Sequence, residues 1–171
     1  MWDTIASEAA AESPVWADAL LPESARRLEA VFSPLGDERY ALGIETIYEG
    51  YLLHYGRPRI FAPPDDDTAL LLGDYLYAHG LVRVAEAGNV AAVADLAELI
   101  SLCAQARAEH RDGDGVAWAA TAARLGSGGL DGARDELRLR ADSRPLEAVA
   151  RADAGDESVA LALAAHERMV G

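Results

Sequence analysis

The chain has 171 residues, a formal net charge of −14, 51% hydrophobic residues and only 6% aromatic residues. This length fits one domain with a hydrophobic core, and abundant alanine with few aromatic residues favours packed helices over a β-sandwich. All fifteen basic residues are arginines, which excludes chemistry that needs lysine, such as a Schiff base or a P-loop. The negative charge argues against a nucleic-acid partner, although a local group of arginines still fits a small anion such as a diphosphate.

The single cysteine and the apolar segments indicate a protein of the reducing cytoplasm. Cys103 has no partner for an internal disulfide and lies on the apolar side of an expected helix, which predicts a buried structural thiol. The first sixteen residues, "MWDTIASEAAAESPVW", lack the basic start and the apolar run of a signal peptide. The strongest apolar run, "TALLLGDYLYAHGLV", contains Asp74 and His79, so no transmembrane segment is expected.

The N-terminal part of the chain predicts short elements. Residues 1–12 are small and acidic, and we expect this end of the chain to be frayed. Ser13 and Pro14 predict a helix start, with serine as the N-cap and proline in the first turn. A further helix is expected over 21–33, where apolar residues recur at helical spacing before a Pro-Leu-Gly stop.

The middle of the chain predicts three longer helices, over 37–55, 68–87 and 90–109. Gly56 ends the first of them. The aspartates at 65–67 predict an acidic cap for the second, because the N-terminus of a helix carries a partial positive charge.

The rest of the chain predicts four shorter helices, over 116–126, 130–142, 144–153 and 156–170. No segment has the alternating pattern of a β-strand. The sequence therefore predicts an all-α fold, a single-domain helical bundle of about seven or eight helices over residues 1–171.

Two groups of polar residues predict no site. The histidines His79, His110 and His166 are far apart in sequence and lack the spacing of a zinc site, so no metal site is predicted. Arg134 and Arg138 are expected to pair with neighbouring aspartates on an exposed helix face.

The stretch "GIETIYEGYLLHYGRPR", residues 43–59, carries the strongest functional signal. Glu45 and Glu49 are four residues apart, so on one helix their carboxylates project from the same face. Two such carboxylates can bridge Mg²⁺, and Arg57 can hold a diphosphate through paired hydrogen bonds. The alternative interpretation is an ordinary solvated helix face that runs into a turn.

This stretch resembles the trans-isoprenyl diphosphate synthase (polyprenyl synthetase) family. In that family a DDxxD motif is followed, after four residues, by Arg-Arg-Gly-x-Pro; here "ETIYE" and "HYGRP" occupy these positions without a gap. Downstream, "ALLLGDYLYAHGL" resembles the family's leucine-rich helix with Gly-Asp, and "AATAARL" resembles its Lys-Thr-Ala segment. The resemblance covers residues 37–125 and implies a truncated isoprenyl synthase fold.

The motifs differ from the family's pattern where the chemistry is most demanding. Thr46 replaces the middle carboxylate, His54 and Tyr55 replace the two arginines, and Ala120 replaces the lysine. The family's second aspartate-rich motif has no counterpart. Prenyl transfer needs Mg²⁺ and basic side chains to neutralise the departing diphosphate, so no catalytic residue of its own is predicted.

Some long-chain polyprenyl diphosphate synthases, of the hexaprenyl and heptaprenyl type, pair a catalytic subunit with a small non-catalytic one, and the chain resembles the small subunit. The resemblance implies a catalytic synthase as partner, with Mg²⁺ bound there and no cofactor in this chain. It also implies a degenerate diphosphate site and a group of residues at a subunit interface or a chain-elongation cavity. The former comprises Glu45, Glu49, His54 and Arg57, and the latter comprises Leu70, Leu71, Leu72, Tyr75, Leu76 and Leu81.

Two other functions remain open. One is a small Mg²⁺-dependent enzyme that binds a prenyl diphosphate through Glu45, Glu49 and Arg57. The other is a helical scaffold without a link to isoprenoids, for example one that forms a homo-oligomer.

Overall fold

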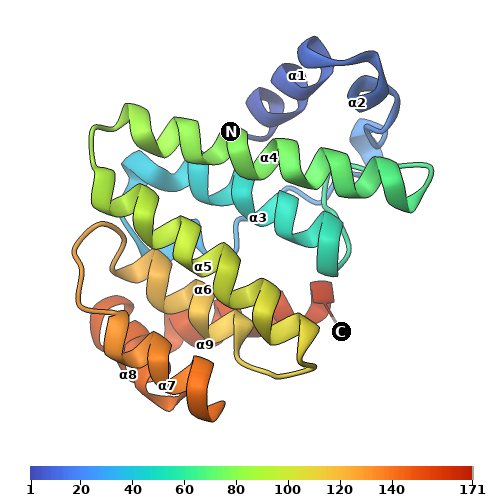
Figure 1. The fold of residues 1–171 in the computed structure, drawn as a ribbon. Helices are drawn as coiled ribbons and strands as arrows, with labels where there is room; N and C mark the ends of the chain where they lie inside the picture. The colour runs from blue at the N-terminus through green and yellow to red at the C-terminus, as the bar shows by residue number, and fades with distance from the viewer. Residues whose placement is uncertain (171) are drawn as a thin grey trace.

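The computed structural model describes residues 1–170 of the chain, and Figure 1 shows a stack of helices. These residues form nine α-helices, three short 3-10 helices and no β-strand, which confirms the predicted all-α fold. None of the helices within this range is long and apolar enough to cross a lipid bilayer. The α-helices are α1 (Trp2–Glu12), α2 (Pro14–Asp18), α3 (Ala41–Tyr55), α4 (Asp66–Glu86), α5 (Val90–Ala108), α6 (Asp114–Ala123), α7 (Asp131–Arg140), α8 (Arg144–Ala154) and α9 (Asp156–Val170).

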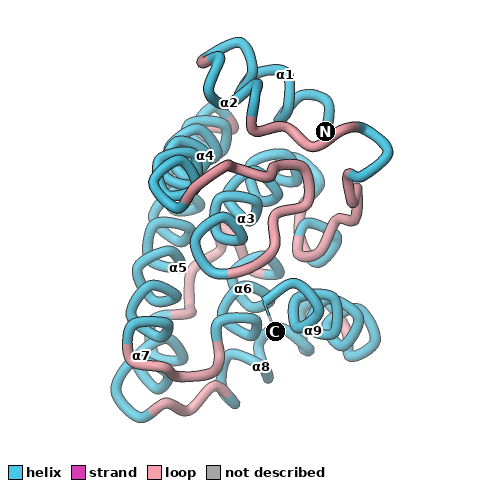
Figure 2. The backbone as a smooth tube through the Cα atoms, turned by 90° about the vertical axis from the view of Figure 1, so that its right-hand side faces the viewer, coloured by secondary structure: helices cyan, strands magenta, loops and turns pink. Residues whose placement is uncertain are grey.

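Among the described residues, helices α3 and α4 make the most extensive helix–helix contact, and they lie side by side in Figures 1 and 2. Glycines let the two backbones approach. A Cβ added to Gly80 would lie 2.4 Å from Cγ1 of Ile47, and one added to Gly50 would lie 2.8 Å from the Gly73 carbonyl oxygen. The close approach of the two helices therefore depends on glycine at these positions.

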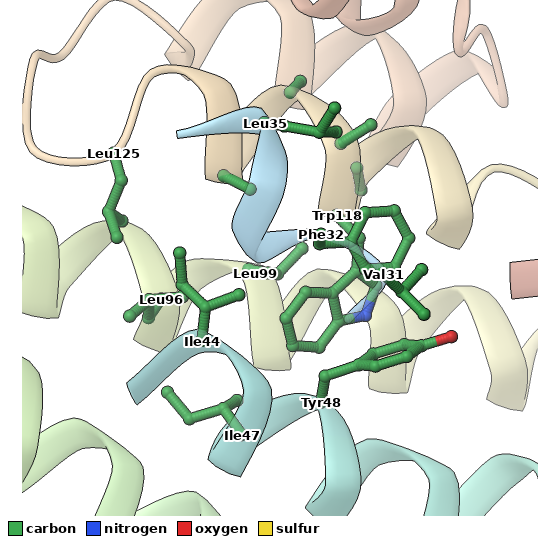
Figure 3. Packing of buried hydrophobic residues seen from close by; sticks show 14 of the residues in the cluster. Val31, Phe32, Leu35, Ile44, Ile47, Tyr48, Leu96, Leu99, Trp118 and Leu125 are labelled. Carbon is green, nitrogen blue, oxygen red and sulfur yellow. The ribbon is translucent and has the colours of Figure 1, made fainter. Parts of the chain in front are cut away.

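The main hydrophobic core lies between α3, α5, α6 and α9, with an aromatic group at its centre (Figure 3). Phe32 stacks on Trp118 at 5.5 Å between ring centroids, and Tyr48 meets Trp118 edge-on at 5.1 Å. Such offset and edge-to-face pairs are the favourable aromatic geometries. Cys103 is buried in the same core, as predicted from the sequence.

A second hydrophobic cluster joins the N-terminal end of the chain to α4. Residues 2–12 were expected to be frayed, but they form α1, whose Ile5 and Ala9 pack in one cluster with Leu72 and Leu76 of α4. Polar contacts fix the same pair of helices, because a Glu8 carboxylate oxygen lies 2.8 Å from Nε2 of His79 and also pairs with Arg83. Residues 1–170 thus form nine α-helices, against the expected seven or eight.

The predicted helix over 21–33 is wrong. Glu23–Ala25 form a 3-10 turn, Ser33 begins a second one (Ser33–Leu35), and residues on both sides of the first turn bond to the segment 59–62. The Leu21 amide donates to the Ile60 carbonyl at 2.9 Å, and the Arg27 amide donates to the Arg59 carbonyl at 2.9 Å. These long-range backbone hydrogen bonds replace the local ones that the helical spacing favoured.

The helix ends of the middle segment agree with the expected caps. The Asp65 carboxylate accepts a hydrogen bond from the Thr68 amide at 2.7 Å, and α4 begins at Asp66. Gly56 follows the last residue of α3, as predicted. Asn89, which was not predicted as a cap, accepts hydrogen bonds from two first-turn amides of α5. These caps place α3, α4 and α5 within a few residues of their predicted ranges.

Candidate functional site

The two glutamates of the predicted diphosphate site lie on α3, where they are fully buried and paired with Arg59. Glu45, Glu49 and Arg59 each have 0% exposed surface. Nη1 of Arg59 donates to Oε2 of Glu45 at 2.5 Å, and its Nε donates to Oε2 of Glu49 at 2.8 Å. The spacing of four residues places both carboxylates on one face of α3, and there both of them contact the guanidinium of Arg59.

The remaining carboxylate oxygens accept hydrogen bonds from backbone amides. Oε1 of Glu45 accepts from the amides of Val31 and Ser33, both at 3.0 Å. Oε1 of Glu49 accepts from the amides of Arg59 at 2.7 Å and Ile60 at 2.9 Å. All four oxygens therefore have donors, and α3 is joined to two loops that lie far apart in sequence.

Arg59 is held on its other sides by carbonyl groups and aromatic rings. Its guanidinium also donates to the carbonyl oxygens of Glu29 at 2.8 Å and Glu45 at 3.1 Å. The rings of Trp2 and Tyr48 lie over its guanidinium carbon at 4.5 and 4.9 Å. Burial lowers the pKa of Arg59, but the two carboxylates raise it by more, so the guanidinium stays charged.

His54 and Arg57, the other predicted diphosphate ligands, have different surroundings. Nε2 of His54 lies 3.4 Å from a carboxylate oxygen of Asp74, and burial lowers the pKa of His54 although Asp74 opposes this. Arg57 is exposed, and its backbone amide donates to the Met169 carbonyl at 2.8 Å. The structure therefore joins the two glutamates to Arg59, which the sequence analysis missed, and it leaves Arg57 at the surface.

The residues predicted for an interface or a chain cavity divide between interior and surface. Leu72 and Leu76 are buried in the second cluster, and Tyr75 and Leu81 are half-buried. Leu70 and Leu71 expose 52% and 59% of their surface on the outer side of α4. Within residues 1–170, no group of three or more His, Cys, Asp or Glu side chains is placed to hold a metal ion.

A second polar cluster, not predicted from the sequence, surrounds Asp114 at the first residue of α6. The Tyr51 hydroxyl donates to Oδ2 of Asp114 and accepts from Nη2 of Arg107 at 2.8 Å; Arg107 also pairs with the same carboxylate. Oδ1 of Asp114 lies 3.6 Å from Nε2 of His166, whose Nδ1 shares a hydrogen bond of 3.0 Å with the Tyr48 hydroxyl. Side chains from α3, α5, α6 and α9 thus meet in one network.

The network has strongly shifted protonation equilibria. Burial raises the pKa of Asp114, but hydrogen bonds from His166 and Tyr51, with the charge of Arg107, outweigh it and hold this pKa well below its usual range. Burial and then the Asp114 charge raise the pKa of Tyr51, and burial raises the pKa of Tyr48. Asp114 is therefore a carboxylate and both tyrosines are neutral hydroxyls at physiological pH.

This network forms one wall of a cavity of about 500 Å³. The cavity lies where the end of α5, the start of α6 and the side of α9 meet, and its lining includes Arg107, Arg111, Asp114, Leu163 and His166. Such a volume is within the range of small-molecule sites, and shifted pKa values are typical of functional sites. No spacing in the sequence indicates this site, because Tyr48 and His166 are 118 residues apart in the chain.

Comparison of the chain with protein-family models, with curated proteins and with solved structures finds no match.

Proposed function

We propose that the chain is a non-catalytic helical subunit that pairs with a catalytic long-chain polyprenyl diphosphate synthase and influences the length of its product. The resemblance of residues 37–125 to the polyprenyl synthetase family supports the choice of partner. In this proposal the catalytic subunit binds Mg²⁺, and this chain holds no cofactor of its own.

The observation that carries the non-catalytic assignment is the engagement of Glu45 and Glu49 by Arg59. Each of their four carboxylate oxygens already accepts a hydrogen bond from Arg59 or from a backbone amide. A Mg²⁺ ion at this place would have to displace the guanidinium of Arg59. The displaced guanidinium would then be a buried charge without its carboxylate partners. The helix and turn of the motif therefore serve the stability of α3 and not the ionisation of an allylic diphosphate.

The outer side of α4 is the surface that we assign to the partner. Leu70 and Leu71 are large apolar side chains that remain in water in the isolated chain. Exposed apolar residues of this kind, grouped on one helix, are typical of contact surfaces. Leu72 and Leu76 stabilise the chain's own second cluster and support this surface from within.

A prenyl-transfer assay with isopentenyl and farnesyl diphosphates and Mg²⁺ tests the proposal. It compares this protein alone, a full-length synthase from the same genome alone, and the mixture of both. We expect long-chain product only in the mixture, or a product of different length in the mixture. Product formed by this protein alone, or a mixture that behaves like the synthase alone, would contradict the proposal.

Matched variants test the assigned surface. Leu71→Asp places a charge on the outer side of α4, whereas Leu139→Asp changes a leucine that is 72% exposed on α7. We expect Leu71→Asp to abolish the effect of the mixture and Leu139→Asp to retain it. If both variants retain the effect, the partner does not bind at this part of α4.

A further inference from the structure

The outer side of α4 carries an apolar stripe that is largely exposed. The stripe consists of Leu71, Tyr75, Ala78, Val82 and Ala85. Leu71 and Val82 expose 59% and 55% of their surface, the two alanines are also exposed, and Tyr75 is half-buried. In Figure 2, which views α4 nearly end-on, one side of this helix has no neighbouring element among residues 1–170. Helix α4 therefore has an unpartnered apolar face in addition to its buried one.

The spacing of the stripe fits a second helix. Its members are separated by alternating intervals of four and three residues, which is the period of the seam between two helices that pack along their length. An extended segment would not match this period, because its side chains recur on one face at every second residue. At a rise of 1.5 Å per residue the stripe is about 21 Å long, which corresponds to about four turns of a partner helix.

Exposed carboxylates flank the stripe. By their positions on the helix, Asp67 and Asp74 lie along one edge of the stripe and Glu86 lies along the other. Within residues 1–170, Asp67 and Glu86 take part in no ion pair, and Asp74 has only Nε2 of His54, at 3.4 Å. Burial lowers the pKa of His54, so this imidazole is neutral at pH 7 and leaves the charge of Asp74 uncompensated.

These charges favour a basic partner over a second copy of the chain. Arg83 is the one arginine in the sequence of α4, and it is already paired with Glu8 of α1. A second copy would bring the same flanking carboxylates to the contact, in a protein with a net charge of −14. Like charges beside a helical seam oppose association, and opposite charges at these positions select the partner.

We infer that the outer stripe of α4 binds an amphipathic helix that has apolar residues along one face and lysine or arginine on both sides of that face. Its apolar residues pack on the stripe, and its cations meet the flanking carboxylates. This inference deepens the proposed function and rests on it, because the same side of α4 is assigned there to the partner. A binding test without synthase can contradict the inference and leave the proposed function standing, and the prenyl-transfer assay can do the reverse.

Fluorescence anisotropy of labelled synthetic peptides with the full chain, at pH 7 and physiological salt, tests the inference. The probe has about three heptads, with leucine at the seam positions and lysine at the flanking positions, so that like charges keep the free peptide monomeric. One control peptide has the same composition in scrambled order, and another has glutamate in place of lysine. We expect saturable binding of the probe, at least about tenfold tighter than that of either control. Absence of binding, or equal binding of the probe and the scrambled peptide, would overturn the inference.

Variants of the stripe locate the contact. Leu71→Gln and Val82→Gln remove apolar side chains without a change of charge, and Leu139→Gln does the same at a leucine that is 72% exposed on α7. We expect each stripe variant to bind the probe about tenfold more weakly and Leu139→Gln to bind it as the parent protein does. Parent-like binding by both stripe variants would overturn the inference. Sedimentation of the chain alone gives a further check, since a dimer that Leu71→Gln dissociates would assign the stripe to a second copy and overturn the inference.

Neutralisation of the flanking carboxylates separates specific from general charge attraction. The combined variant Asp67→Asn, Asp74→Asn and Glu86→Gln should lower the affinity for the probe about tenfold or more. A control with the same change of net charge neutralises three exposed carboxylates outside α4, by Asp112→Asn, Asp131→Asn and Glu157→Gln. This control should bind nearly as the parent protein does. Equal losses in the two combined variants would show that only the net charge matters and would overturn the inference.

Discussion

Arg59 determines whether two carboxylates can remain in the interior. Replacing it with methionine would keep most of its volume but leave Glu45 and Glu49 without the guanidinium that bridges them. We expect Arg59→Met to lower the free energy of unfolding by about 3–5 kcal/mol, the usual cost of an unpaired buried charge. Urea unfolding followed by circular dichroism measures this change.

The matched control is Arg39→Met, because Arg39 pairs with Asp37 at 3.1 Å but its side chain is 55% exposed. Exposed pairs contribute about 0–1 kcal/mol, so the control should remain near the parent protein. Equal unfolding midpoints for the two variants would show that the pairing of Arg59 with Glu45 and Glu49 contributes little to stability.

Asp114 predicts a loss of stability in acid. Its pKa is lowered in the folded protein, so the folded state favours the carboxylate and Asp114 contributes stability above its unfolded pKa of about 3.9. That contribution is lost as the pH falls from about 5 towards and through the lowered folded pKa. At pH 7 we expect the urea midpoint of Asp114→Asn to lie below that of the parent protein. The difference between the two midpoints should become smaller as the pH falls towards 3.

Urea midpoints measured at several pH values between 7 and 3 test this prediction. A matched control is Asp131→Asn, which changes an aspartate whose side chain is 97% exposed at the start of α7. Its effect should be small at every pH. A difference for Asp114→Asn that stays constant or widens in acid would contradict the assigned direction of the pKa.

For single residues, the sequence predicted the relative placement of Glu45 and Glu49 but not their burial or their pairing with Arg59. Helical spacing alone placed both carboxylates on one face, and the structure confirms that they meet. Every residue from Gly43 to Leu53 is buried in the structure. The sequence signal for this burial was the presence of apolar residues on every side of the helix. A helix that is apolar on all sides is a core helix, and an acidic residue in it needs a buried partner.

The prediction that Arg134 and Arg138 both lie on an exposed face of α7 was wrong for Arg134. Arg138 pairs with Asp135 on the surface as expected, at 3.0 Å. Arg134, in contrast, is buried and its guanidinium donates to Asp95 of α5 at 2.9 Å. An i,i+3 spacing identifies a possible local pair, but it contains no information about a carboxylate on another helix.

Among the helices, the pairing of α3 and α4 predicts an unusual effect of alanine substitution. Alanine normally stabilises a helix relative to glycine by about 1 kcal/mol. At Gly80 the added methyl group would meet Ile47 and the Gly43 carbonyl oxygen, at 2.4 and 3.0 Å, so the helices must separate. We expect Gly80→Ala to lower the free energy of unfolding by about 1–3 kcal/mol despite the gain in helix propensity.

Gly132 in α7 provides the comparison, because an added Cβ meets no atom within 4 Å. Gly132→Ala should be neutral or stabilising, by up to about 1 kcal/mol. Thermal unfolding of both variants measures the contrast. A stabilised Gly80→Ala protein would mean that α3 and α4 adjust to the methyl group without loss of packing.

Element prediction succeeded where local chemistry decides and failed where distant segments do. The start of α4 follows from the predicted cap, Asp65, whose side chain accepts a hydrogen bond from the Thr68 amide. Helix α5 begins at Val90, as its apolar spacing predicted. The helix expected over 21–33 was lost to hydrogen bonds with residues 59–62, and α1 gained order from the second cluster. Contacts between residues far apart in sequence are absent from a periodicity pattern, which explains both errors.

For the whole molecule, the net charge of −14 predicts stabilisation by salt. Repulsion between surface carboxylates opposes the compact state, and added salt screens it. We expect the Tm at pH 7 to rise by about 2–5 °C between roughly 50 mM and 500 mM NaCl. The rise should be much smaller near the isoelectric point of about 4.5, where the net charge vanishes. Equal shifts at both pH values would point to a cause other than charge repulsion.

For the whole molecule, the sequence predicted an all-helical fold, because the alanine content, the helix stops and the absence of the alternating pattern of β-strands agree. It did not reveal the meeting of Asp114 and His166, because that site depends on how α6 and α9 pack. Tertiary proximity of single residues from opposite parts of a chain has no local signature.

The Arg59 network also imposes an order on synthesis. A ribosome releases α3 with both glutamates before Arg59, Ile60 and the α4 surface have left the exit tunnel. Until then α3 has the Val31 and Ser33 amides for Glu45 but neither the counter-ion nor the Glu49 donors. Burial of α3 is therefore postponed until the turn with Arg59 and Ile60 has emerged. A nascent chain that ends before Arg59 keeps Glu45 and Glu49 in water.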